Sequence, residues 1–159
     1  MSKLKKNDES IITDKEHEIS LLKTKICTYR NMLSELNANS QLSKFRDSGI
    51  IKLLKIRLSR KATGTVVLEE DVWKKLIVQF AHLVPTAYTT IGRDGVLSPQ
   101  ELRMCILLLS DFDNNEINSL MNISPQNATN IKAKANKKLF GEDTASSLRT
   151  NLADIYGIV

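Results

Sequence analysis

Two Ser-Pro pairs, Ser98–Pro99 and Ser124–Pro125, divide the last third of this 159-residue chain into short helices. Serine is favoured at the N-cap of a helix and proline at the first helical position, so each pair predicts a helix start. Glu101 stands at the third helical position and completes a capping box with Ser98. Short helices with well-marked starts predict a small helical bundle for this part of the chain.

The C-terminal part is predicted to hold four helices. The first follows Ser98, and its buried stripe is Leu102, Cys105, Ile106 and Leu109. The second begins at Asn114 or Asn115, the third runs from Pro125 to about Leu139, and the last follows Asp143. Two short helices joined by a brief turn are typical of a helix-turn-helix, in which the second helix enters the major groove of DNA.

The predicted helix 125–139 carries side chains suited to DNA. Amide and hydroxyl groups in its first turns can hydrogen-bond to base edges, and lysines follow them. No acidic residue occurs between Glu116 and Glu142. A serine at the helix N-terminus also suits a phosphate contact. The predicted DNA-binding residues are Ser124, Gln126, Asn127, Thr129, Asn130, Lys132, Lys134, Lys137 and Lys138. The alternative is a small helical domain with a lysine-rich solvated face.

Four separated motifs in this order resemble the LuxR-type helix-turn-helix family: Leu97–Leu102 (LSPQEL), Asn114–Ile117 (NNEI), Asn122–Pro125 (NISP) and Lys137–Leu139 (KKL). With the Trp-containing segment at Val72–Trp73, the chain looks most similar to the C-terminal DNA-binding part of bacterial tetratricopeptide-repeat regulators. The resemblance covers about residues 69–139. It implies that Thr129, Asn130 and Ala133 face the major groove and that the last helix contributes to a dimer. It also implies an upstream sensor or membrane-anchored segment if the chain is a fragment.

The chain departs from the pattern of that family at several positions, among them Ala128 and Ala135–Asn136, and three further departures matter most. Asp111 stands where the family has a glycine, Asn118 where it has a small alanine, and Asn127 where it has a threonine. The turn at Asp111 must then form without the residue that most easily takes a positive φ. These departures motivate a competing hypothesis, in which a degenerate helix-turn-helix serves as a protein–protein interaction and oligomerisation module.

A heptad pattern occupies the N-terminal part, in a helix predicted from Ser10 to about Asn37. From Ile19 onward the apolar residues follow in steps of 3, 4, 3, 4 and 3, which makes a seam of alternating a and d positions. Isoleucine at a with leucine at d favours two parallel strands. Glu18 and Lys23 could pair between strands, whereas Lys25 and Arg30 would repel. The predicted dimerisation residues are Ile19, Leu22, Ile26, Tyr29, Leu33 and Leu36. The alternative is an amphipathic helix that packs on its own domain.

Between these parts lies a predicted helical connector. One helix covers Ser48–Leu58 and a second covers Glu69–Leu83, whose Trp73 and Phe80 are expected in the core. A strand remained an alternative from Lys55 to Leu58. The basic segment Lys52–Lys61 offers a less favoured function, in which the chain binds RNA or an acidic membrane.

Several functional classes find no support in the sequence. There is no Ser/His/Asp set, no phosphate-binding loop and no metal cluster, so we expect no enzyme, no cofactor, no metal and no small-molecule substrate. The calcium-loop spacing at Asp111, Asp113 and Asn115 fails, because Glu116 stands where glycine is needed. Two cysteines without CxxC spacing indicate reduced thiols, and no apolar signal segment follows the basic N-terminus, so a cytoplasmic location is expected.

The sequence therefore predicts an all-α protein in three segments. Residues 1–46 are the segment of the long amphipathic, coiled-coil dimerisation helix, residues 47–92 a helical connector, and residues 93–159 a C-terminal four-helix bundle with a LuxR-type helix-turn-helix. The expected function is transcriptional regulation by a homodimer that reads double-stranded DNA. The net charge of +5 agrees with such a partner but lies mostly in residues 48–97.

Overall fold

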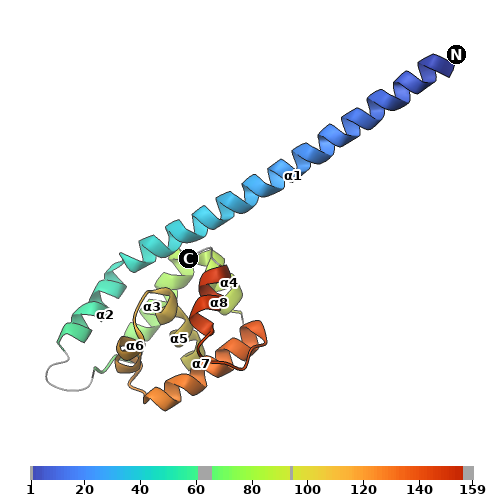
Figure 1. Cartoon of the computed structure of the whole chain (residues 1–159). Coiled ribbons are helices and arrows are strands. Elements are labelled where there is room, and N and C mark those ends of the chain that lie inside the picture. Colours follow the sequence, from blue (N-terminus) through green and yellow to red (C-terminus); the bar gives the residue numbers. More distant parts are fainter. Residues whose placement is uncertain (1, 61–65, 94, 156–159) are drawn as a thin grey trace. The chain divides into compact units, whose positions relative to one another are not determined.

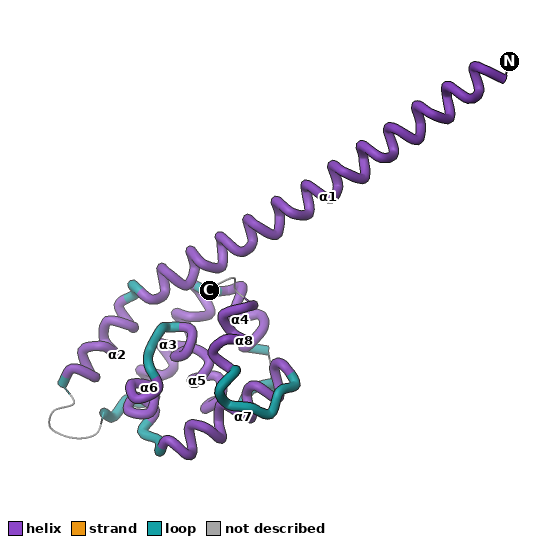
Figure 2. Tube along the Cα trace, viewed as in Figure 1, coloured by secondary structure: helices purple, strands orange, loops and turns teal. Residues whose placement is uncertain are grey.

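In a computed structural model of the chain, the described residues 2–60, 66–93 and 95–155 form helices joined by turns, with no β-strand among them (Figure 1) (Figure 2). The side chains of residues 2–8, 34–38 and 155 lie outside this description. The helices are α1 (Ser2–Arg46), α2 (Gly49–Ser59), α3 (Glu70–Leu83), α4 (Pro85–Ile91), α5 (Pro99–Leu109), α6 (Asn114–Met121), α7 (Pro125–Phe140) and α8 (Leu148–Ile155). The predicted all-α class is confirmed. Within the described residues, no helix combines the length and apolar character that a membrane crossing needs.

The chain divides into two compact units, residues 1–37 and 38–159. These units do not coincide with the predicted segments 1–46, 47–92 and 93–159. The physical reason is that one hydrophobic core runs from Leu42 to Leu152. That core joins the last turns of α1 and the connector helices to the helices of the C-terminal segment.

In the first unit, α1 exposes every described side chain from residue 9 to residue 33. The prediction that this helix ends near Asn37 is wrong, because α1 continues to Arg46. Its last turns belong to the second unit, where Leu42 and Phe45 are buried. Burial of these two side chains stabilises helical backbone that the polar residues before them would by themselves disfavour.

Helix α5 lies at the centre of the second unit and contacts α3, α6, α7 and α8 (Figure 1). Within the predicted stripe, Cys105, Ile106 and Leu109 are buried and Leu102 is half-buried. Met104, Leu107 and Leu108 are buried as well. A helix that is apolar almost all round fits a position with neighbours on several sides.

The connector helices pack onto the same core. Trp73 and Phe80 are buried as predicted, and the rings of Phe45 and Phe80 meet edge to face with centroids 5.1 Å apart. Helix α3 ends at Leu83, and Pro85 begins α4, a helix that the sequence pattern did not predict. Proline fits the first position of α4 because its fixed φ suits a helix start.

Local capping sets the ends of α6 and α7. Asp113 is the N-cap of α6 and forms a capping box with Glu116, so the predicted start at Asn114 holds. Asn122 ends α6 in the left-handed region at φ 53, and the Ile123 amide donates to the carbonyl of Asn118. Only three residues, 122–124, separate α6 from α7. The connection between α6 and α7 is therefore short.

Candidate nucleic-acid interface

The outward face of α7, defined here as Gln126, Asn127, Thr129, Asn130, Lys134 and Lys137, consists of exposed polar and basic side chains. Residues three, four or eight apart share one side of a helix, so Gln126, Asn130, Lys134 and Lys137 form a row along α7. On the opposite side, Ala128, Ile131 and Ala135 are buried against the core. The buried side fixes which side chains α7 presents.

Side-chain hydrogen bonds stabilise the first turn of α7. The Ser124 hydroxyl accepts a bond of 3.1 Å from the Asn127 amide. The Thr129 hydroxyl donates a 3.0 Å bond to the carbonyl of Pro125. Both hydroxyls are exposed, so the Thr129 oxygen keeps lone pairs and Ser124 keeps its proton for a bond to a ligand. The positive end of the helix dipole lies at the same turn and favours an anion there.

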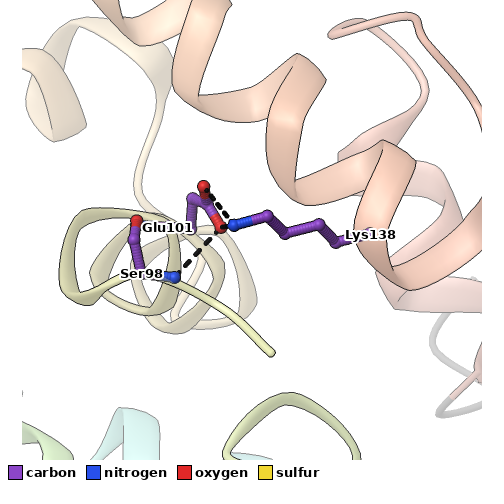
Figure 3. Close-up of polar contacts among 3 residues, drawn as sticks. All are labelled: Ser98, Glu101 and Lys138. Atoms are coloured by element: carbon purple, nitrogen blue, oxygen red, sulfur yellow. Dashed lines mark hydrogen bonds and ion pairs between the residues drawn. The ribbon is translucent and has the colours of Figure 1, made fainter. Parts of the chain in front are cut away.

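Lys138 is exposed along its side chain, but its ammonium binds a buried carboxylate. Its Nζ donates to both carboxylate oxygens of Glu101, at 3.0 and 2.9 Å, and Glu101 is 4% exposed (Figure 3). The same carboxylate accepts a 3.1 Å bond from the amide of Ser98, within the capping box of α5 (Figure 3). Glu101 therefore ties the start of α5 to the last turn of α7, and Lys138 holds the position of α7.

The environment of Glu101 favours its charged form. Burial by itself would raise the pKa of this carboxyl, but the hydrogen bonds from Lys138 and Ser98 and the charge of Lys138 outweigh it. The pKa of Glu101 consequently lies below its usual value of 4.5. The carboxylate stays ionised and keeps its bonds to α7 at neutral pH.

Lys132 is half-buried, and its Nζ donates a 2.8 Å bond to the side-chain oxygen of Asn114 at the start of α6. Burial and the nearby charge of Arg149 lower the pKa of Lys132. By contrast, Lys137 forms an exposed ion pair with Asp143 at 3.5 Å, and Lys134 is exposed. Of the four predicted lysines, Lys134 and Lys137 belong to the outward face, whereas Lys132 and Lys138 brace the bundle.

A polar network at the end of α7 involves residues that the sequence did not predict as a site. Asn136 is fully buried, donates to the carbonyl of Thr144 at 2.6 Å and to the Ser147 hydroxyl at 2.8 Å, and accepts from Asn151 at 3.0 Å. Glu142 accepts from Ser147 and Asn151, which lowers the pKa of Glu142. An asparagine beside the buried Ala135 was the available sequence signal. The network fixes α8 against α7.

The structure accommodates the three departures from the LuxR-type pattern in different ways. Asp111 takes φ 69, so an aspartate fills the left-handed position of the turn after α5. Asn118 is half-buried, and its side-chain oxygen has no hydrogen-bond partner among the described residues. Asn127 is exposed in the first turn of α7, while the next residue, Ala128, is the one that packs inward.

The predicted dimerisation residues lie in the first unit. Ile19, Leu22, Ile26, Tyr29 and Leu33 have exposed fractions between 50% and 63%. The side chain of Leu36 lies outside the described residues. No core residue of the second unit belongs to this set. These side chains share one stripe of α1 and remain open to solvent.

The basic segment of the connector folds as α2, so helix replaces the strand alternative. Lys52, Lys55 and Arg60 are exposed, whereas Arg57 bonds to the carbonyl of Val67 and pairs with Glu69. Lys61 lies outside the described residues. The segment is therefore a solvated basic face in which one of the cations has an acidic partner.

The arrangement as a whole offers a convex row of hydrogen-bonding and cationic groups on a braced helix. In the part of the chain that the structure describes, no group of three or more His, Cys, Asp or Glu could hold a metal ion. The chain matches no protein-family model, and comparisons with curated proteins and with solved structures gave no match.

Proposed function

We propose that this chain is a DNA-binding transcriptional regulator that inserts α7 into the major groove of duplex DNA and acts by binding, without catalysis, in the bacterial cytoplasm. One observation carries the proposal: the outward face of α7 is polar and basic, contains no acidic residue, and follows α6 after three residues. Helix α6 would cross the backbone in such a complex, as the first helix of a helix-turn-helix does. The resemblance to LuxR-type domains supports the same function.

The side chains have distinct roles in this proposal. Gln126, Asn127 and Asn130 would bond to base edges, since amides read adenine and other bases in the major groove. Lys134 and Lys137 would neutralise phosphates. Ser124 would add a phosphate contact at the helix N-terminus. Lys132 and Lys138 would act indirectly, by holding α7 in place.

Fluorescence anisotropy with a random-sequence duplex across a salt series tests the proposal. We expect affinity to fall steeply as salt rises, because phosphate contacts release counterions. Lys134→Ala should weaken binding and reduce the slope of log K against log salt by about 1. Lys74→Ala is the matched control, an exposed lysine on α3 that should leave binding unchanged. Absence of binding at low salt, or an equal effect of the two substitutions, would contradict the proposal.

The second candidate is a protein–protein interaction module. The hydrogen bonds of Lys132 to Asn114 and of Lys138 to Glu101 favour it, because they leave α7 with fewer unpaired cations for phosphates than the sequence suggested. Exposed acids at Glu142 and Asp143, close to the end of α7, point the same way. The salt series distinguishes the two, since a protein-binding face predicts no anisotropy change with any duplex.

A further inference from the structure

The exposed apolar side chains of α1 fall on one stripe. The heptad register is set by Ile19 at position a. Position a is also occupied by Ile12, Ile26 and Leu33, and position d by Leu22 and Tyr29. Ile11 and Met32 stand at the neighbouring position g. All of them are at least half exposed. We call this set the α1 seam: Ile11, Ile12, Ile19, Leu22, Ile26, Tyr29, Met32 and Leu33. Leu21 is the large exposed apolar residue of this part that lies outside it.

We infer that the α1 seam binds a second copy of this chain and forms a parallel two-stranded coiled coil with it. A single helix in water gains little from its own hydrogen bonds, so a long amphipathic helix needs a partner for its apolar side. The stripe from Ile12 to Leu33 is about 32 Å long at 1.5 Å per residue. A second copy supplies an apolar stripe of equal length and the same 3.5-residue period.

The residue types at the seam favour two strands that run in the same direction. β-Branched isoleucine occupies three of the four a positions, and leucine occupies the d position of the central heptad. In a parallel pair each a or d residue of the seam meets the same residue of the second copy, so the apolar layers match. Lys15, which stands at d, then faces only the second Lys15, toward the N-terminal end of the stripe.

The charged residues beside the seam distinguish the two orientations. Parallel pairing places Glu18 at g against Lys23 of the second copy at e, an attractive pair. An antiparallel pair would instead bring g against g. The register that joins Glu18 to Lys25 of the second copy would then press Lys15 against Ile26 in the apolar seam. That register puts a lysine into two apolar layers, whereas parallel pairing confines both Lys15 side chains to one layer near the N-terminal end of the stripe, so the parallel arrangement interrupts fewer apolar layers.

Parallel pairing also brings Lys25 against Arg30 of the second copy, and these like charges repel. Each side of the coil therefore has one attractive and one repulsive charge pair, which limits the stability of the dimer.

The two strands of the parallel coil end side by side, about 10 Å apart between helix axes. Both copies of the 38–159 unit thus follow the same end of the coil. The proposal concerns α1 and does not depend on DNA binding by α7.

Sedimentation equilibrium of the full chain tests both the partner and the orientation. We expect a dimer for the unchanged chain. Lys25→Glu turns two symmetry-related repulsive contacts into attractive ones and should lower the dimer Kd about tenfold. Arg30→Glu should do the same, and the double variant should return to the original affinity. Thr24→Glu with Asn31→Glu is the control, because these changes add equal charge at outer f positions and should leave the Kd unchanged.

Ile26→Asp should yield a monomer, and the tryptophan fluorescence of Trp73 reports that the 38–159 unit remains folded. Ile12→Cys in a Cys27→Ser background should form an intermolecular disulfide upon oxidation, because a residues of parallel strands face each other. A monomer in the unchanged chain, or a dimer that survives Ile26→Asp, would overturn the inference. Weaker association of Lys25→Glu, together with no disulfide at position 12, would show antiparallel strands and overturn it as well.

Discussion

Glu101 shows how a single residue connects folding to the candidate interface. It caps α5 through the amide of Ser98 and holds α7 through Lys138. A buried carboxylate without such partners would be strongly destabilising, so Lys138 cannot be removed without consequence for Glu101. The pair therefore links the last turn of α7 to the first turn of α5.

We predict that Glu101→Ala lowers the free energy of unfolding by about 1–2 kcal/mol at neutral pH, because it removes the capping box and the hydrogen bonds from Lys138, whose exposed ammonium returns to water. Since the pKa of Glu101 is lower in the folded chain than in the unfolded chain, its contribution is present above about pH 4–5 and is lost as the pH falls through the folded pKa. The difference between the two proteins should therefore shrink in acid.

Urea unfolding at neutral pH and in acid measures this effect. The fluorescence of Trp73, the single tryptophan, which is buried, follows the transition. Lys137→Ala is the control, since its exposed ion pair with Asp143 should contribute under about 0.5 kcal/mol. Equal losses from Glu101→Ala and Lys137→Ala would contradict a structural role for the buried pair.

At the scale of elements, α7 is defined at both ends by local chemistry and along one side by packing. Ser124 caps its start, and Gly141 ends it with φ 74 in the left-handed region. The buried side, with Ala128, Ile131 and Ala135, determines the rotation of the helix about its axis. The outward face is the consequence of that rotation.

We predict that Ser124→Ala lowers the stability of the 38–159 unit by about 1 kcal/mol, because the Asn127 amide loses its acceptor. Ser124→Asp should keep the stability of the original chain, since aspartate caps well and suits the helix dipole. The same aspartate should weaken DNA affinity, because it places a negative charge where a phosphate would bind. Thermal unfolding and anisotropy measure the two effects, and an unchanged melting temperature for Ser124→Ala would speak against the cap.

At the scale of the whole molecule, the chain consists of a solvated helical unit and a compact bundle. The bundle begins inside α1, so Phe45 and Arg46 belong to it, and Arg46 donates two hydrogen bonds to the carbonyl of Leu109 at the end of α5. A cation there satisfies a helix C-terminus. The two units carry one cysteine each, Cys27 exposed and Cys105 buried.

We predict that one thiol per chain reacts rapidly with an aromatic disulfide reagent in the folded protein. Cys27 is exposed, whereas burial and the charge of Glu101 raise the pKa of Cys105 to about 12, so its thiolate is scarce. Cys105 should react only as the bundle unfolds, and its rate should rise with urea. Cys27→Ser provides the control, with no rapid phase; two rapid thiols in the unchanged chain would contradict the burial of Cys105.

How much of the fold followed from the sequence depends on the range of the interactions. The starts at Ser98 and Ser124 and the stripe of α5 were predictable, because caps and periodicity act within one or two turns. The continuation of α1 to Arg46 and the helix that begins at Pro85 were missed. Both depend on burial in a core assembled from distant segments. DNA binding by α7 and dimerisation by the α1 seam stay predictions.

The sequence alone determined the helical class, the short spacing between α6 and α7 and the residues available to α7, since these depend on neighbours in the chain. Only the tertiary structure decided which lysines of α7 bind side chains of other helices. Lys138 turns to Glu101, 37 residues away, and Lys132 turns to Asn114, 18 residues away. The local sequence determines the position of a charged side chain on its helix. The partner of that side chain depends on which helices pack together in the core.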